Sequence, residues 1–424
     1  MTCPVPSPRS PLSELPELFM VAEPDWHLDL LASFTALVER TDAGLLRVGG
    51  DEVVAFRYRD VKALATTPEA GNTPVTLLAA ASQRREGHPR AVPEAGGGFF
   101  GMLADQAFTH NPPLHEHTRR ALGRQLLLHN TERFRPSARA VMAELLSSLE
   151  GRREVDFARD VARPYAVRFF GEMLGMTVEE AEEVSALMRE MSAVFLLERS
   201  PADSARIDGA ADRYVALVEH AAGRPRRGPG AELVAEMRAD IESIEVEGRP
   251  ASIGRFLAAN LFDGFHTVAV AVANCWYCLL AAGMDDALRA DRGLVASAVV
   301  EGLRLAPPLL LTHRQALADL VHDGVEIPAG TSIAMLWGSP NRDPEAWSDP
   351  AAYRLDRDRQ VLFSFGGGPH LCPGRNAARM LCEVALEALV SCGARWRLAE
   401  HGYRFVPASA MRELVAFPLE ISWG

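Results

Sequence analysis

The chain has 424 residues, of which 48% are hydrophobic and 24% are charged, so it carries enough apolar material for a large core. Its formal net charge of −12 provides no general attraction for nucleic acid or for an anionic membrane surface, and we exclude both as partners. The proline-rich start, MTCPVPSPRSPLSELPELF, has no apolar run of signal-peptide or membrane-anchor length. We therefore expect a cytoplasmic protein.

The first quarter of the chain mixes helical, strand-like and irregular patterns. Residues 25–41 have the periodicity of a helix. Residues 46–56 predict two strands around a Gly-Gly turn. Residues 70–105, with the breaker cluster EAGGG, predict a loop.

The rest of the chain is mostly helical in pattern. Short strands are expected over 307–335 and from 395 onward, on either side of an irregular stretch at 337–371. No linker separates two domains, so we expect one mainly α domain with minor β over residues 1–424. Helices are expected at 115–128, 132–150, 159–175, 177–198, 204–223, 252–281, 294–305 and 374–392.

The six cysteines are scattered along the chain and form no disulfide framework. Cys275 and Cys278 make a CxxC, but they lie inside the apolar, helix-like run VAVAVANCWYCLLAA. No second cysteine or histidine pair follows at the spacing of a zinc site. We interpret these two residues as buried cysteines of the long helix.

The most specific motif is FGGGPHLCPG at 365–374. A cysteine thiolate that binds iron needs a tight, glycine-rich loop, which turns backbone N–H groups toward the sulfur and leaves room for a flat macrocycle. Gly366, Gly368 and Gly374 supply this backbone freedom. An ordinary glycine-rich loop around a cysteine is disfavoured, because the pattern F-G-x-G-x-H-x-C-x-G fixes six positions at once.

At these residues the chain resembles the cytochrome P450 family, whose haem-binding signature this motif is. The resemblance implies the family's mainly α fold with minor β, a triangular prism. It also implies haem b (iron protoporphyrin IX) between the long distal helix and the cysteine loop. Cys372 would then be the metal ligand, the axial thiolate of the haem iron, with Phe365 and Gly366 beside the cofactor.

A second family element is the E-x-x-R pair of Glu301 and Arg304, one helical turn apart. The resemblance identifies it as a structural ion pair behind the haem. Its third partner comes from the irregular segment, where Arg354 and Arg357 both fit and the sequence does not choose between them.

Further elements of the resemblance concern the haem propionates. His115 and Arg119, in NPPLHEHTRRAL, stand four apart on one predicted helix at the place where the family binds them. Arg314, in THRQALADL, and His370, two residues before the cysteine, match further propionate ligands. Arginine suits carboxylates because it presents a fork of donors. An ordinary surface ion pair is the alternative for each residue, and their joint order favours the haem.

The long predicted helix carries DGFHT at 263–267. In the family this place has a glycine that lets the helix distort, followed by an acid and an alcohol that deliver protons. Gly264 and Thr267 fit, but His266 stands at the acid position and Asp263 stands where a small residue is usual. Histidine relays protons near neutral pH, although packing away from the haem is the alternative for His266. We take Thr267, His266 and Asp263 as candidate catalytic residues.

Asp263 stands one helical turn before Thr267, and a carboxylate in an apolar site is costly unless it is paired or protonated. Three roles would offset the cost: a relay through His266 to Thr267, an anchor for a cationic or hydrogen-bond-donating substrate, or an ester to a haem methyl. The alternative is that Asp263 faces solvent or a structural arginine. The sequence leaves all four open.

The resemblance implies a monooxygenase that uses O2 to hydroxylate or epoxidise a small organic substrate in secondary-metabolite biosynthesis. Because the acid position is altered, oxidative coupling or ring formation without oxygen insertion is the alternative. A non-catalytic P450-like partner protein is a third, disfavoured because Cys372 is present.

No reductase is fused to the chain, so the resemblance implies that a ferredoxin and a ferredoxin reductase supply electrons. An arginine-containing surface offers a site for an acidic ferredoxin, and ordinary solvated charge is the alternative. This surface consists of Arg120, Arg124, Arg375 and Arg379.

Overall fold

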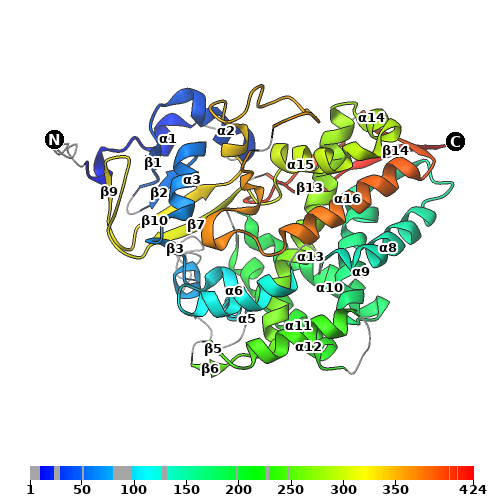
Figure 1. The fold of residues 1–424 in the computed structure, drawn as a ribbon, viewed down its shortest axis with the longest axis horizontal. Helices are drawn as coiled ribbons and strands as arrows, with labels where there is room; N and C mark the ends of the chain where they lie inside the picture. The colour runs from blue at the N-terminus through cyan, green and yellow to red at the C-terminus, as the bar shows by residue number, and fades with distance from the viewer. Residues whose placement is uncertain are drawn as a thin grey trace. The chain divides into compact units, whose positions relative to one another are not determined.

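The chain is described by a computed structural model and forms two compact units, which are presented one at a time. The predicted single domain over 1–424 stays a prediction. Unit 1 comprises Met1–Thr73, Leu309–Ala352 and Gln360–Cys372, and unit 2 comprises Pro74–Pro308, Tyr353–Arg359 and Pro373–Gly424 (Figure 1). The structure describes residues 10–22, 29–49, 52–79, 98–126, 131–196, 199–224, 229–246, 248–358, 360–400, 402–407 and 409–424.

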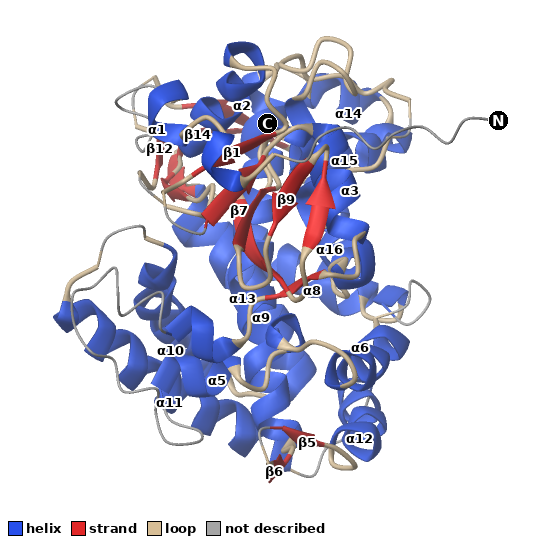
Figure 2. Cartoon of the chain, turned by 90° about the vertical axis from the view of Figure 1, so that its left-hand side faces the viewer, coloured by secondary structure: helices blue, strands red, loops and turns tan. Residues whose placement is uncertain are grey.

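Unit 1 is built on a five-stranded sheet, whose strands are red in Figure 2. β2 and β10 pair in parallel, and the other neighbours are antiparallel. One side of the core contains Val53, Ile333 and Met335 packed with Phe363. In sheet order the strands are β1 (Leu45–Arg47), β2 (Glu52–Ala55), β10 (Ser332–Leu336), β7 (Leu311–Ala316) and β3 (Ala70–Asn72).

Smaller elements complete the described part of unit 1. The short helices and the hairpin lie around the sheet, and the hairpin strands pair antiparallel. These elements are α1 (Leu18–Val21), α2 (Leu30–Arg40), α3 (Tyr58–Thr66), β8 (Leu320–His322) and β9 (Val325–Ile327).

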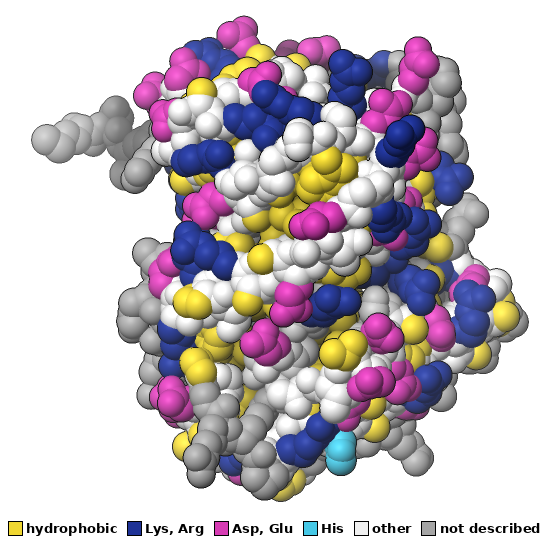
Figure 3. All heavy atoms as spheres, turned by 90° about the vertical axis from the view of Figure 1, so that its right-hand side faces the viewer, with side chains coloured by type: hydrophobic (Ala, Val, Ile, Leu, Met, Phe, Trp, Pro, Cys, Tyr) yellow, Lys and Arg dark blue, Asp and Glu magenta, His cyan; other side chains and the backbone are white. Residues whose placement is uncertain are grey.

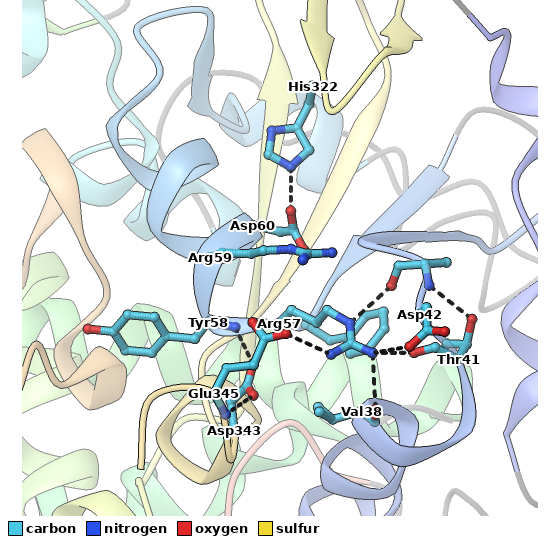
Figure 4. Close-up of polar contacts among 12 residues, drawn as sticks. Val38, Thr41, Asp42, Arg57, Tyr58, Arg59, Asp60, His322, Asp343 and Glu345 are labelled. Carbon is cyan, nitrogen blue, oxygen red and sulfur yellow. Dashed lines mark hydrogen bonds and ion pairs between the residues drawn. The ribbon is translucent and has the colours of Figure 1, made fainter.

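The N-terminal end of α3 is held by a group of polar contacts, shown in Figure 4. The backbone N–H of Tyr58 donates to Asp343 Oδ2 at 2.8 Å, which satisfies one of the otherwise unpaired donors of the first turn. The buried Arg57 guanidinium donates to the carbonyl of Val38 at 3.0 Å and also to that of Thr41. These bonds fix where α3 starts and therefore where its other end lies.

Unit 2 is mainly helical, and α13 (Ile253–Ala281) packs against α9, α11, α15 and α16. Among the described helices, α13 alone is long and apolar enough to cross a membrane, and 72% of its most apolar window is buried inside the protein. The other helices are α5 (Gly98–Leu103), α6 (Leu114–Gln125), α8 (Arg135–Ser147), α9 (Arg163–Leu174), α10 (Val178–Met191), α11 (Pro201–Gly223), α12 (Pro229–Ile241), α14 (Asp285–Ala290), α15 (Val295–Leu305) and α16 (Arg375–Ser391).

The strands of unit 2 form small antiparallel sheets. A loop between β12 and β13 brings Glu413 to the edge of β13. The strands are β4 (Glu154–Asp156), β5 (Glu245–Val246), β6 (Arg249–Pro250), β11 (Ala394–Leu398), β12 (Arg404–Phe405), β13 (Leu414–Ala416) and β14 (Pro418–Trp423).

Most predicted elements are confirmed, including the strand pair at 46–56 and the long helix at 252–281. The loop predicted over 70–105 is wrong in its described parts, because β3 and α5 lie there and both are buried. Sequence breakers did not prevent these elements, since tertiary pairing and burial outweigh weak local propensity. Cys275 and Cys278 are buried as expected, and no metal-binding cluster occurs among the described residues.

Charged side chains of both signs occur on the face of the protein drawn in Figure 3. On the face seen in Figure 3, basic and acidic side chains are interspersed, and hydrophobic side chains form small groups.

Candidate functional site

The cysteine loop in unit 1 is closed by a backbone hydrogen bond from the N–H of Cys372 to the carbonyl of Phe365, at 2.9 Å. Gly366 and Gly368 adopt φ values of +69° and +66°, which side chains with a Cβ rarely tolerate. Phe365, Gly366 and Cys372 are all half-buried. The motif therefore forms a compact loop with positive φ angles at two glycines, in agreement with the tight, glycine-rich loop predicted from the sequence.

Close packing against α3 adds a second requirement for glycine in this loop. A Cβ at Gly368 would lie 1.8 Å from the carbonyl oxygen of Ala65, and one at Gly367 would lie 3.0 Å from the Ala65 Cβ. The C-terminal end of α3 thus forms a wall for the loop. The contacts of Arg57 and Tyr58 at the other end of α3 hold this wall in place.

Arg314 and His370, both predicted from the sequence, are brought together by a residue that was not predicted. Asn72, fully buried on β3, accepts from Arg314 Nη1 at 2.6 Å through Oδ1, and its Nδ2 lies 2.8 Å from His370 Nδ1. Arg314 is buried, and desolvation lowers the pKa of its guanidinium to about 10. No carboxylate among the described residues pairs with it, so this cation is suited to an external anion.

His115 and Arg119 lie one turn apart on α6 in unit 2, as the sequence predicts. His115 is buried and Arg119 is half-buried. Their spacing presents both side chains on one face of the helix.

Glu301 and Arg304 form a buried ion pair on α15, with hydrogen bonds of 2.8 and 2.7 Å. Both arginines of the irregular segment join it: Arg357 Nε donates to Glu301 Oε1 at 2.8 Å, and the backbone N–H of Arg354 donates to the same oxygen at 2.9 Å. The side-chain partner is therefore Arg357. Burial works to raise the pKa of Glu301, but the bonds from Arg304 and Arg357 bring it below its ordinary value.

The DGFHT segment lies in the middle of α13. The hydroxyl of Thr267 donates to the backbone carbonyl of Asp263, four residues earlier, at 2.6 Å. Such bonds compete with the helical ladder and loosen the turn. Gly264 faces α9, where an added Cβ would lie 3.2 Å from Phe170, so its small size is needed for helix packing as well.

The carboxylate of Asp263 is accessible to solvent but has protein around it on most sides. Its Oδ2 accepts a 2.8 Å hydrogen bond from Gln106 Nε2. Desolvation raises the pKa of Asp263 to about 6, against the lowering effects of His266 and Gln106. The protein surroundings dominate, because a carboxylate in a confined space is poorly hydrated even where single waters reach it.

His266 is buried, and its described contacts are with Glu413 and Phe195. Its Nε2 lies 3.3 Å from Glu413 Oε2, and its ring stacks on Phe195 with the centroids 5.8 Å apart. Glu413 lies 3.5 Å from Arg163 Nη2 as well. Burial acts to raise the pKa of Glu413, but His266 and Arg163 hold it below its ordinary value. A carboxylate therefore does stand next to the acid position, although it comes from the C-terminal part of the chain.

The predicted site residues form separate groups within the two units. Three residues that contact the predicted site residues were not predicted from the sequence: Asn72, Gln106 and Glu413. Asn72 and Gln106 fell in or beside the stretch predicted as loop, and Glu413 fell in a tail read only as strands. Each is an ordinary polar residue in its local context, so no sequence signal identifies it.

Comparisons with known proteins identify the family and the fold. The Cytochrome P450 family model matches residues 284–392. Cytochrome p450 CYP199A2 of Rhodopseudomonas palustris is 30% identical over 284 residues, which cover 66% of this chain and 67% of the relative. The 6-deoxyerythronolide B hydroxylase of Saccharopolyspora erythraea is 25% identical over 366 residues, covering 86% and 88%.

A solved structure shows the same fold. The crystal structure of CalO2 matches with a TM-score of 0.78 at 23% identity, and the match covers 94% of this chain and 98% of that one. The mainly α fold, the cysteine loop and these relatives lead to one conclusion: the chain belongs to the cytochrome P450 family of haem b monooxygenases.

Proposed function

We propose that this monooxygenase hydroxylates or epoxidises a small organic substrate in the biosynthesis of a secondary metabolite, in the cytoplasm. The observation that carries the proposal is the cysteine loop, in which a closed, glycine-dependent turn presents Cys372. The relative named as a hydroxylase of 6-deoxyerythronolide B supports the reaction class.

The residues present fit haem b. Arg314 is a buried cation with no carboxylate partner among the described residues. A haem propionate would supply the missing negative charge. We assign Cys372 as the iron ligand, Phe365 and Gly366 as residues beside the ring, and His115, Arg119, Arg314 and His370 as propionate ligands. When bound with a thiolate ligand, haem b would supply the activation of O2, which consumes two electrons and two protons.

The chain's own task is to place donors and to move protons. The hydroxyl of Thr267, which donates a hydrogen bond to the backbone carbonyl of Asp263, would give up a proton and regain one from solvent. The imidazole of His266, whose Nε2 lies 3.3 Å from Glu413 Oε2, is the proposed proton carrier. In this proposal His266 and Glu413 together replace the acid that the family usually places before the threonine.

Electrons are proposed to come from a ferredoxin and its reductase. Arg120 on α6 and Arg379 on α16 are exposed, and Arg375 is half-buried. The two helices meet where Asn376 Nδ2 donates to the carbonyl of Leu126 at 3.1 Å. These cations suit an acidic iron–sulfur protein, so electron transfer should slow as salt rises.

The test is the spectrum of the reduced, CO-bound protein. The wild type should show the long-wavelength Soret band that gives the family its name, and Cys372→Ala should lose it while Cys392→Ala, at a cysteine outside the loop, should keep it. A Cys372→Ala protein that retained the band would refute the ligand assignment. Once a substrate is known, ¹⁸O from labelled O2 in the product distinguishes oxygen insertion from oxidative coupling, the alternative that the altered acid position raises.

A further inference from the structure

The segment before α6 is clamped onto α13 beside Asp263. The backbone N–H of Ala107 donates to Asn260 Oδ1 at 3.1 Å, and Asn260 Nδ2 donates to the carbonyl of Asp105 at 3.2 Å. Gln106 is buried and donates both to the carbonyl of Ala259 at 3.2 Å and to Asp263 Oδ2 at 2.8 Å. The orientation of the Asp263 carboxylate is thus fixed in advance by the fold.

The charge of Asp263 is not neutralised in the described part of the chain. Two other acids each have an arginine: the buried Asp105 lies 3.0 Å from Arg255, and the half-buried Glu413 lies 3.5 Å from Arg163. Asp263 has only the amide of Gln106, and His266 turns its Nε2 to Glu413 instead. Its second oxygen, Oδ1, has no donor among the described residues, and solvent reaches the side chain.

A carboxylate that is oriented, accessible and without a cation is costly unless a ligand supplies the positive charge. Its place one turn before Thr267 puts it at the segment proposed to deliver protons. We propose that Asp263 binds a cationic amine or ammonium group of the substrate and so selects basic organic molecules. This inference rests on the proposed monooxygenase function.

The relay from Asp263 through His266 is not supported by the contacts. The described partners of His266 are Glu413 and Phe195, and Asp263 accepts from Gln106. A structural role is not supported either, because no arginine among the described residues pairs with Asp263. The substrate-anchor role uses both the fixed Oδ2 and the accessible Oδ1.

The test compares ligands that differ only in charge, using the haem-loaded protein. The probes are phenylalkyl-trimethylammonium ions of graded chain length and their neutral isosteres, in which a tert-butyl group replaces the trimethylammonium group. A quaternary nitrogen has no lone pair, so it cannot bind the iron and obscure the result. Binding is measured by equilibrium dialysis and by displacement of the distal water in the haem difference spectrum.

The wild type should bind the best cation about tenfold more tightly than its isostere, as one charge-assisted contact implies. Asp263→Asn keeps the size and the contact with Gln106, and it should remove most of that preference while changing binding of the isostere less than about twofold. Glu144→Gln, which removes an exposed charge on α8, is the matched control and should change nothing.

Two results would overturn the inference: a wild type that shows no preference for any cation of the series, or an Asp263→Asn protein that retains the preference. The CO spectrum separates this failure from failure of the proposed function. A protein with a normal CO band and no cation preference loses only the inference, whereas a protein without the band loses the haem-thiolate assignment.

The pH dependence supplies a second readout, because the quaternary probe itself does not titrate. Cation binding should be full above about pH 6 and should fall as the pH drops through that value, since desolvation raises the pKa of Asp263 to about 6. The groups around Asp263 are the neutral Gln106, Asn260 and Thr267 and the titratable His266 and Tyr214. Cation binding that is flat through pH 6, or that falls in parallel with binding of the isostere, would contradict the assignment.

Discussion

Glu301 and Asp263 are both carboxylates of unit 2, but Glu301 is buried and Asp263 is accessible to solvent, and their charges are compensated to very different extents. Glu301 receives two side-chain bonds from Arg304, one from Arg357 and a backbone N–H from Arg354. Asp263 receives one amide bond from Gln106. The pKa is below its ordinary value for Glu301 and is raised to about 6 for Asp263.

The difference separates a structural charge from a functional one. Burial of an ion is tolerated when opposite charges and hydrogen bonds compensate it inside the protein, which is the case for Glu301. A poorly hydrated charge with few partners in the protein can instead be compensated by a ligand of opposite charge. Groups with perturbed pKa values are concentrated at functional sites. The same residue class therefore stabilises the fold at one place and prepares a binding site at the other.

Removing the compensated acid should give the largest effect. Glu301→Gln leaves Arg304 and Arg357 buried without their counter-charge, and we expect a loss of about 3–5 kcal/mol in the free energy of unfolding. Chemical denaturation measures it, with the exposed-site variant Glu144→Gln as control. A loss below about 1 kcal/mol would show that the cluster is not a principal support of unit 2.

Substitution of His266 should have an effect of intermediate size. Its carboxylate partner, Glu413, is paired with one arginine, Arg163, and so is compensated less than Glu301 and more than Asp263. His266→Phe preserves the stack on Phe195 but removes the proton-exchanging ring. Turnover should fall by about tenfold to a hundredfold, with more O2 diverted to peroxide.

Glu413→Gln is the matched variant for His266→Phe. It should lower turnover and coupling in the same direction by a smaller factor, because His266 loses the carboxylate that lies 3.3 Å from its Nε2. If both variants retained wild-type coupling at every pH, His266 would be a packing residue only.

The smallest effect should be the change in the free energy of unfolding caused by Asp263→Asn. A carboxyl whose pKa rises from 3.8 to about 6 on folding destabilises the fold when it ionises, so the wild type should lose stability relative to the variant as pH rises through that window. The gap should stay below about 1 kcal/mol, because solvent reaches the group. Unfolding curves at several pH values measure it.

Glu301 predicts the opposite pH dependence. Its lowered pKa contributes stability that is present above its ordinary value of 4.5 and is lost as the pH falls below it. If Asp263→Asn instead lost stability at neutral pH, the carboxylate would have a stabilising partner and the contrast with Glu301 would fail.

Much of the site could be predicted from the sequence because its motifs are local. The cysteine loop, the pair on α15 and the spacing of His115 and Arg119 each depend on residues a few positions apart, whose geometry follows from turn and helix rules. The long helix at 252–281 was predicted correctly for the same reason. Its departures at Asp263 and His266 were also visible, but their roles were not.

The sequence by itself determined the family, the iron ligand expected at Cys372 and the identity of the unusual residues on α13. Only the tertiary structure decided the partners: Arg357 at Glu301, Asn72 between Arg314 and His370, Gln106 at Asp263 and Glu413 at His266. Local spacing fixes conformation within a turn or a loop, whereas the compensation of a charge depends on which distant segments fold against it. Asp263, with only a neutral amide partner, is therefore the proposed substrate anchor, whereas His266, beside the carboxylate of Glu413, is part of the proposed proton relay.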